Sequence, residues 1–169
     1  MKKLVLILVF LFFVGCATLS ETNSIPNFRA VNTSLAIYRG GQMNTNGLLY
    51  LKSVGVSNII KLDSTSESKA SKVEIDAARS MGMHVTYIPM DRKEQLFGPV
   101  QKWKVELAVK NMIPGTYVHC LHGQDRTGLI VALYKMRQGV PKKVAEKEML
   151  DNGFHKSLHG LWEYFEHSK

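Results

Sequence analysis

Short apolar or alternating runs are separated along this chain by longer stretches in which apolar residues recur at helical spacing. Four such runs predict β-strands: residues 34–40 (SLAIYRG), 57–63 (SNIIKLD), 83–90 (MHVTYIPM) and 116–120 (TYVHC). The stretches between and after them predict helices over residues 46–55, 71–82, 99–112, 127–139 and 141–153, with a last amphipathic helix around 158–165.

Three of the predicted helices carry more detailed signals. In the helix 71–82, Ser71 and Glu74 have the spacing of a capping box at its start. In the helix 99–112, Val100, Trp103 and Leu107 fall on one face. The helix 127–139 is apolar on nearly all sides, which predicts a central and buried position.

The alternation of strands and helices predicts an α/β fold with a central, mostly parallel sheet flanked by helices. The chain has 169 residues, which suits one domain with a core of ordinary size. We expect that domain to occupy residues 31–169.

The first residues differ in composition from the rest. Lys2 and Lys3 precede an apolar run from Leu4 to Val14, which is shorter than the roughly 20 residues needed to cross a bilayer. A basic start, a short apolar stretch and then small residues are typical of a secretory signal peptide. The end of this segment, FFVGC, resembles the lipobox of bacterial lipoproteins.

That resemblance implies a lipoprotein signal peptide over residues 1–15, cleavage after Gly15 and lipidation of Cys16. Residues 16–30 would then form a polar tether between the lipid and the domain. The protein would lie in the bacterial cell envelope, outside the cytoplasmic membrane and attached to it or to the outer membrane. A plain signal peptide, or an uncleaved anchor with a spare cysteine, is the alternative.

The charge composition of the chain indicates which chemical class of partner it binds. Without Lys2 and Lys3, the 22 basic residues become 20 against 14 acidic ones, a net charge of +6. A basic balance favours anionic partners such as phosphorylated molecules. No long basic block interleaved with aromatic residues is present, so we expect no nucleic-acid partner.

The chemistry is concentrated in residues 118–128, VHCLHGQDRTG. Cys120 comes at the end of a predicted strand, and Arg126 and Thr127 at the start of a predicted helix. The loop between them can direct backbone N–H groups inward as an anion cradle, which would also keep the Cys120 sulfur ionised. Arg126 offers a planar fork for two phosphoryl oxygens, and Gly128 allows the helix to pack closely.

HCLHGQDRTG resembles the H-C-x5-R-[S/T]-G signature of cysteine-dependent phosphatases, the protein tyrosine and dual-specificity superfamily, and the chain length suits the compact dual-specificity type. The resemblance implies that Cys120 attacks phosphorus to give a phosphocysteine. Arg126 would bind the phosphoryl oxygens, Thr127 would hydrogen-bond the sulfur, and His119 and Gly128 would order the loop. It implies no metal and no other cofactor.

A general acid is also expected from this resemblance, on a separate loop about 30 residues before the cysteine. Asp91 lies 29 residues before Cys120, directly after a predicted strand. It could protonate the leaving group and then activate water. Asp63 and Glu94 are the substitutes for this role.

Loop residues and one distant arginine are the expected substrate contacts: Leu121, His122, Gly123, Gln124, Asp125, Arg126 and Arg39. Arg39 lies in YRGGQM, which resembles a segment of inositol-phosphate-directed relatives, and a structural turn is the alternative. Asp125 would disfavour a highly charged substrate unless it points outward. His155 and His159 have the i, i+4 spacing of zinc ligands, but ordinary surface histidines are favoured.

The sequence leaves several functions open. The first is a dual-specificity-type phosphatase acting on phosphotyrosine, phosphoserine or phosphothreonine, and the second is the same chemistry on an inositol polyphosphate. An RNA 5′-triphosphatase shares CxHGxxRTG, but export argues against it. A rhodanese-like sulfurtransferase and a binding-only pseudo-phosphatase are further alternatives, disfavoured by the Arg-Thr-Gly ending and by the presence of both Cys120 and Arg126.

Overall fold

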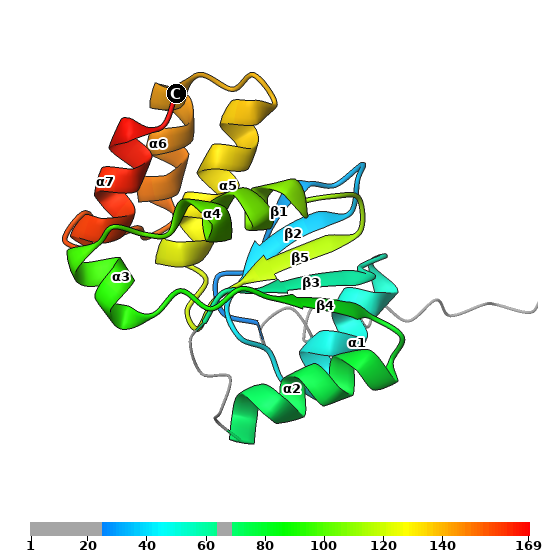
Figure 1. The fold of residues 1–169 in the computed structure, drawn as a ribbon. Helices are drawn as coiled ribbons and strands as arrows, with labels where there is room; N and C mark the ends of the chain where they lie inside the picture. The colour runs from blue at the N-terminus through cyan, green and yellow to red at the C-terminus, as the bar shows by residue number, and fades with distance from the viewer. Residues whose placement is uncertain (1–24, 64–68) are drawn as a thin grey trace, which may run out of the picture.

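The computed structural model of this protein describes residues 25–63 and 69–169. A mixed sheet lies between two layers of helices (Figure 1). In spatial order its strands are β1 (Arg29–Asn32), β2 (Ile37–Gly40), β5 (Thr116–His119), β3 (Asn58–Lys61) and β4 (His84–Tyr87). All neighbours pair in parallel except β1, which is antiparallel to β2. The predicted α/β class with a mostly parallel sheet is confirmed.

The helices are divided between the two faces of the sheet (Figure 1). One face carries α1 (Thr45–Ser53) and α2 (Lys69–Ser80), and the other carries α4 (Lys102–Lys110), α5 (Asp125–Arg137), α6 (Lys142–Asp151) and α7 (His159–His167). The short helix α3 (Arg92–Phe97), which the sequence pattern did not predict, packs against α7.

Successive side chains of each strand point to opposite faces of the sheet, so the apolar residues form two separate cores. Ile59 and Tyr117 belong to the cluster that contains the α1 and α2 side chains, whereas Ile60 and Val118 belong to the cluster around α5. Helix α5 is buried from Thr127 through Tyr134, which confirms its predicted central position.

The predicted buried face of helix α4 is wrong for Trp103 and Leu107, whereas Val100, which precedes the helix, is buried in the α5 core. Trp103 and Leu107 are 56% and 39% exposed, and the buried side chains of this helix include Val105, Ala108 and Val109. These three small residues form a stripe at i, i+3 and i+4 that packs into the α5 core, so the bulky Trp103 remains outside.

The predicted capping box is also wrong. Helix α2 begins at Lys69, so Ser71 lies inside the helix, and Glu74 is buried rather than at the helix end. A capping box occurs at α3 instead: Asp91 Oδ1 accepts a hydrogen bond from the Glu94 N–H at 2.9 Å, and Glu94 Oε2 accepts one from the Asp91 N–H at 2.9 Å.

The predicted domain boundary at residue 30 lies too late in the chain. Ile25 is 3% exposed in the core beneath α1 and α2, and the Pro26 carbonyl accepts a hydrogen bond from the Gly41 N–H at 2.7 Å. The folded domain therefore includes residues 25–30. The predicted signal peptide, Cys16 and the first part of the predicted tether lie outside the described residues.

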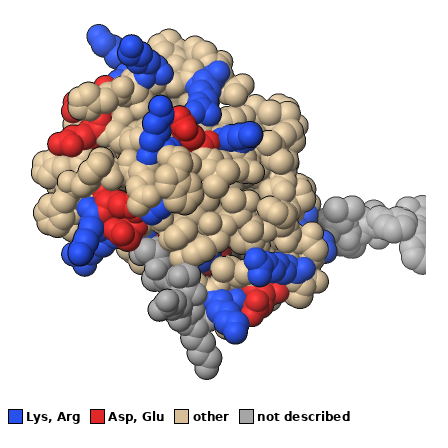
Figure 2. Space-filling view, in the orientation of Figure 1, with Lys and Arg blue, Asp and Glu red and all other residues tan. Residues whose placement is uncertain are grey.

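Charged side chains are scattered over the face of the molecule shown in Figure 2. Lys and Arg side chains stand singly or in small groups there, several with Asp or Glu beside them, rather than forming one basic patch. Within residues 25–63 and 69–169, the structure has no helix whose length and apolar character would let it span a bilayer.

Candidate active site

The signature residues lie at the carboxyl edge of the sheet, where open α/β sheets bind their ligands. Strand β5 ends at His119, Cys120 follows it, and a loop of residues 121–124 leads into α5 at Asp125. The strand–loop–helix arrangement predicted for this segment is therefore present.

The carbonyl groups at the start of the loop are held by residues near the N-terminus of the domain. The Leu121 carbonyl accepts a hydrogen bond from the Gln42 N–H at 3.0 Å. The His122 carbonyl accepts one from the Asn27 side-chain amide at 2.8 Å. A peptide whose C=O is held on one side presents its N–H to the other, so these bonds direct the loop amides away from the β2 side.

No backbone N–H of residues 121–127 donates a hydrogen bond to any described part of the chain. A run of unpaired amides at the N-terminus of a helix is the arrangement that binds phosphate and other oxyanions.

Gly123 is a position that only glycine can fill. Its φ is +75°, and a Cβ there would lie 2.3 Å from the Gly40 carbonyl carbon and 2.6 Å from the Gly41 nitrogen. Both contacts are with backbone atoms, which have little freedom to move. The consecutive glycines after Arg39 thus let β2 approach the loop closely, a role that the sequence did not reveal.

Arg39 lies beneath the loop and not in the cavity in front of it. Its side chain is 2% exposed, and Nη2 donates to the Gly123 carbonyl at 2.7 Å and more weakly to the Gln124 carbonyl at 3.5 Å. Burial lowers the pKa of Arg39 below its ordinary value, although the charges of Cys120 and Glu148 oppose this shift. The expected substrate contact through Arg39 does not fit this position, because the side chain is buried, does not line the cavity, and donates to the loop carbonyls through Nη2.

Arg126 faces the cavity with part of its guanidinium free. Its Nη1 donates to the carbonyls of Leu62 and Met90 at 3.4 and 3.3 Å, which lie just beyond the ends of β3 and β4. Its Nε is buried and has no partner among the described residues, and the same holds for the Oγ1 of Thr127. The hydrogen bond expected from Thr127 to the Cys120 sulfur is therefore not present in this structure. Two buried polar groups without partners at the start of α5 indicate a place for a polar ligand.

The cavity at Cys120 has a volume of about 370 Å³. Four further predicted contacts line it, namely Leu121, His122, Asp125 and Arg126, together with residues the sequence did not suggest: Arg92, Gln95, Leu96 and Leu158. Gln124 and Gly123 are not among the lining residues, and the Gln124 side chain lies against Gly153 instead.

Asp125 is held at the side of this cavity by His155. Asp125 Oδ1 accepts a hydrogen bond from the His155 N–H at 2.8 Å and lies 2.9 Å from the ring Nδ1. The carboxylate is thus fixed in place but still contributes to the cavity wall. Among the described residues, no group of three or more His, Cys, Asp or Glu side chains is placed to hold a metal ion.

The candidates for general acid occupy different positions. Asp91 is exposed and follows Met90, whose carbonyl binds Arg126, so it lies at the rim of the cavity without lining it. Asp63 does line the cavity, but its Oδ1 is 2.8 Å from the buried Lys61 Nζ. Glu94 is bound by Lys104 at 2.8 Å. Of the three, Asp91 is the carboxylate without a cationic partner among the described residues.

A charged cluster behind Cys120 was not predicted from the sequence. His119 Nε2 lies 3.0 Å from Glu74 Oε1, and Lys61 Nζ lies 3.1 Å from Glu74 Oε2. Burial raises the pKa of Glu74, but the hydrogen bond and charge of His119, with the charge of Lys61, outweigh it and leave the pKa below its ordinary value of 4.5. The lysine within the apolar run IIKLD was the signal that could have indicated such a cluster.

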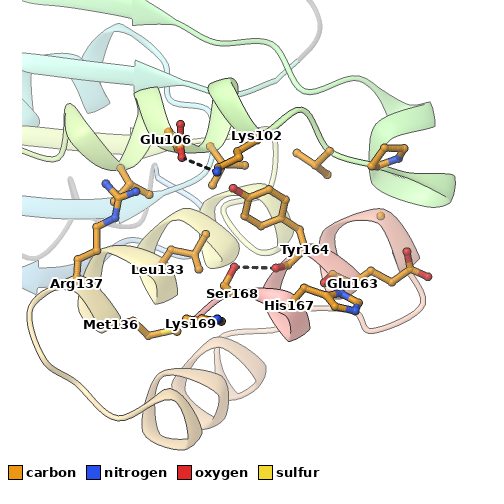
Figure 3. Close-up of a pocket in the computed structure, with 15 residues that line it drawn as sticks. Lys102, Glu106, Leu133, Met136, Arg137, Glu163, Tyr164, His167, Ser168 and Lys169 are labelled. Atoms are coloured by element: carbon orange, nitrogen blue, oxygen red, sulfur yellow. Dashed lines mark hydrogen bonds and ion pairs between the residues drawn. The ribbon is translucent and has the colours of Figure 1, made fainter.

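A larger cavity, of about 510 Å³, lies between α4, α5 and α7 (Figure 3). Lys102 and Glu106 on its wall are paired at 3.5 Å, and Tyr164 projects into the same space. Burial, with the charge of Glu106, raises the pKa of Tyr164 above 10.0. No residue of the loop that follows Cys120 lines this cavity, so it is separate from the candidate active site.

The solved structures that are similar to this one include proteins that are named as phosphatases. The catalytic core of the PP-IP phosphatase Siw14 from S. cerevisiae matches with a TM-score of 0.67 at 16% identity, over 85% of this chain and 86% of that chain. TpbA from P. aeruginosa matches with a TM-score of 0.62 at 20% identity, over 84% of this chain and 90% of that chain.

Kinase-associated phosphatase matches with a TM-score of 0.60 at 16% identity, over 84% of this chain and 93% of that chain. At these identities the likeness establishes the fold. No match was found among curated proteins.

The family evidence comes from a sequence profile described as "DSP-PTPase phosphatase fused to NAD+ Kinase", which matches residues 14–160. This range covers most of the chain and contains every residue of the loop and cavity. The chain therefore belongs to this family of cysteine-dependent phosphatases of the dual-specificity type, which hydrolyse phosphate esters.

Proposed function

We propose that this protein hydrolyses phosphate monoesters on proteins, at phosphotyrosine and at phosphoserine or phosphothreonine, with Cys120 as nucleophile. The observation that carries the proposal is the run of amides at residues 121–127 that have no partner among the described residues, together with the cavity that Cys120 and Arg126 both line. An oxyanion with several acceptor oxygens satisfies all of these donors together.

The reaction proceeds in two displacements. In the first, Cys120 Sγ forms a bond to phosphorus while the ester P–O bond breaks, and Asp91 gives its proton to the departing oxygen. In the second, Asp91 accepts a proton from water, the water oxygen bonds to phosphorus, and the S–P bond breaks to release inorganic phosphate. The loop amides and Arg126 stabilise the phosphoryl oxygens in both transition states.

A protein substrate is favoured over a polyphosphate by the charges around the cavity. Two acidic side chains, Asp63 and Asp125, line it beside two basic ones, Arg92 and Arg126. A site built for several phosphate groups needs an excess of cations. Of the similar proteins, TpbA has been solved in complex with phosphotyrosine, whereas Siw14 is a PP-IP phosphatase. An inositol polyphosphate therefore remains the second candidate.

The test is release of inorganic phosphate from a panel containing p-nitrophenyl phosphate, phosphopeptides and an inositol polyphosphate. We expect wild type to prefer phosphopeptides over the inositol polyphosphate. Cys120→Ser should abolish turnover while vanadate still binds, and Arg126→Ala should lose both turnover and vanadate binding. Activity that survives in Cys120→Ser would refute the mechanism, and a preference for the polyphosphate would replace the substrate class.

Asp91 is tested separately with substrates of different leaving-group quality. Asp91→Asn should lower kcat for an alkyl phosphate by roughly 100-fold and for p-nitrophenyl phosphate much less, because nitrophenolate needs little protonation. Equal losses on both substrates would move the acid to another residue, and Asp63→Asn is then the variant to measure.

We infer from the leader sequence alone that Cys16 carries a lipid and holds the domain at the cell envelope, outside the cytoplasmic membrane. Labelling of expressing bacteria with a palmitate analogue tests this inference. Label on wild type that disappears in Cys16→Ala supports it, and unlabelled wild-type protein would overturn it.

A further inference from the structure

Three ionisable side chains lie buried behind Cys120 and take no part in the mechanism above. Lys61 and His119 are each 0% exposed and Glu74 is 6% exposed. Charged groups are rarely buried to this extent unless they are paired, and their desolvation costs several kcal/mol for each ion. Such a cluster directly beside a catalytic loop invites a functional explanation.

The sheet and helix α2 bring the three groups together. Lys61 and His119 are register partners in the parallel pair β3–β5, so their side chains lie next to each other on one face. That face is the one covered by α2, from which Glu74 reaches both: Oε1 lies 3.0 Å from His119 Nε2 and Oε2 lies 3.1 Å from Lys61 Nζ.

The second ring nitrogen of His119 points to the loop. Its Nδ1 lies 3.3 Å from the Cys120 carbonyl oxygen. Both nitrogens therefore face oxygens that can only accept hydrogen bonds, Glu74 on one side and a backbone carbonyl on the other. A neutral imidazole has one N–H and would leave one of these contacts repulsive. A ring protonated on both nitrogens would present an N–H to each oxygen.

We propose that Glu74 is a positioning residue of the phosphatase site. Its carboxylate keeps His119 doubly protonated and aimed at the Cys120 carbonyl, and so fixes the first peptide of the loop and maintains a positive charge beside the sulfur. This inference rests on the proposed function of Cys120. The proposed role of Glu74 depends on the charge and on the length of its side chain, and Glu74 acts on the loop through His119.

The other groups around His119 are compatible with this role. Tyr117, on the same strand, stacks on the ring with centroids 5.5 Å apart and donates its hydroxyl to the Gly41 carbonyl. Burial, with the charges of Glu74 and Cys120, raises the pKa of Tyr117 well above 10.0, so this neighbour stays neutral. Lys61 also contacts Asp63 at 2.8 Å, which leaves Glu74 as the carboxylate in contact with His119.

Two substitutions at Glu74 separate the effect of its charge from the effect of its side-chain length. Glu74→Gln keeps the length of the side chain and removes its charge, whereas Glu74→Asp keeps the charge and shortens the side chain. The measurement is the alkylation rate of Cys120 by iodoacetamide from pH 5 to pH 9 in the full chain, read by mass spectrometry on the peptide that contains Cys120. Reading that peptide separates Cys120 from Cys16.

We expect Glu74→Gln to move the alkylation profile to higher pH by roughly half a unit to one unit, which at pH 6 is about a three- to tenfold slower reaction. Glu74→Asp should give a smaller shift, because it retains the charge. The plateau rate at high pH should not change in either variant, since the exposure of the sulfur is unaltered. An unmoved profile in Glu74→Gln would overturn the proposal.

A double-mutant cycle tests whether Glu74 acts through His119. His119→Asn retains a donor toward the Cys120 carbonyl but cannot be protonated, so adding Glu74→Gln to it should shift the profile no further. Equal shifts in the presence and absence of His119 would refute the proposed connection. Phe165→Leu, a core change in α7, serves as the control for destabilisation alone and should leave the profile in place.

The proposed phosphatase function and the proposed role of Glu74 can be refuted separately. Alkylation does not require turnover, so the series measures the effect of Glu74 on the sulfur even if wild type releases no phosphate. Absence of phosphate release from the whole panel would refute the proposed function. Normal phosphate release together with an unmoved profile in Glu74→Gln would refute only the role of Glu74.

Discussion

Replacement of Arg39 by methionine distinguishes a loop-supporting role from substrate contact. Methionine approximates the length and apolar character of the arginine stem but has no N–H donors. The structure gives Arg39 a buried position in which Nη2 donates to the Gly123 carbonyl at 2.7 Å. Arg39→Met therefore removes the support of one loop peptide and alters nothing that lines the cavity.

The magnitude follows from that hydrogen bond. A hydrogen bond with one charged partner contributes about 1.5–3 kcal/mol, and the weaker 3.5 Å contact with Gln124 adds little. If the loop must be ordered to bind phosphate, the same energy is lost from the transition state. Since about 1.4 kcal/mol corresponds to tenfold, kcat/KM should fall by roughly 10- to 150-fold.

The assay is kcat/KM for p-nitrophenyl phosphate, a phosphotyrosine peptide and an inositol polyphosphate, with thermal unfolding in parallel. A supporting role for Arg39 predicts a similar loss on all three substrates. Arg137→Met, the same substitution at an exposed position of α5, is the control and should leave all three unchanged. A loss confined to the inositol polyphosphate would show that Arg39 contacts substrate and would refute the reasoning.

Three other changes test the site from different directions. Gly123→Ala should abolish vanadate binding because its Cβ would meet backbone at 2.3 Å, whereas Gly139→Ala, also at positive φ but with nothing within 4 Å, should cost only about 1 kcal/mol of stability and no activity. Asp125→Asn should raise kcat/KM for an inositol polyphosphate severalfold more than for p-nitrophenyl phosphate, and equal effects would argue against charge selection. Because the pKa of Glu74 is lowered, its stabilisation is present above 4.5 and is lost as the pH falls through its lower value in the folded protein. Urea unfolding should therefore show the stability advantage of wild type over Glu74→Gln shrinking between about pH 5 and pH 3, and a constant difference would contradict this pKa shift.

The sequence predicted what depends on neighbours along the chain. Strands β2 to β5 and the long helices follow from local periodicity, and the loop from Cys120 to Arg126 is one contiguous signature, so both could be identified without coordinates. Strand β1 was missed, because its four residues fall in a stretch that was assigned in part to the tether. The short helix α3 was missed because its six residues provide too few positions for a periodic signal.

Contacts between distant segments could not be predicted in the same way. Asn27 and Gln42 hold loop carbonyls through a side-chain amide and a backbone N–H, groups that almost any surface segment also contains. Arg39 was singled out, but its side chain could have pointed to either side of the loop, and only the packing of β2 against β5 decides between them. Glu74 has capping-box spacing from Ser71, and burial overrides that local preference.

The loop that follows Cys120 is supported from both faces of the sheet because side chains alternate along its strands. Val118 and its register partner Arg39 lie on the face covered by α5, from which Arg39 reaches the Gly123 carbonyl. His119 is the next residue and lies on the opposite face, where Glu74 holds it against the Cys120 carbonyl. Two consecutive residues of β5 thus face different sets of side chains that hold the loop. On the Val118 face, Arg39 holds the Gly123 carbonyl, and on the other face His119 and Glu74 hold the Cys120 carbonyl. Any change that shifted β5 by one residue would exchange the two faces and remove both supports together, which ties the anion site to the register of the central strand.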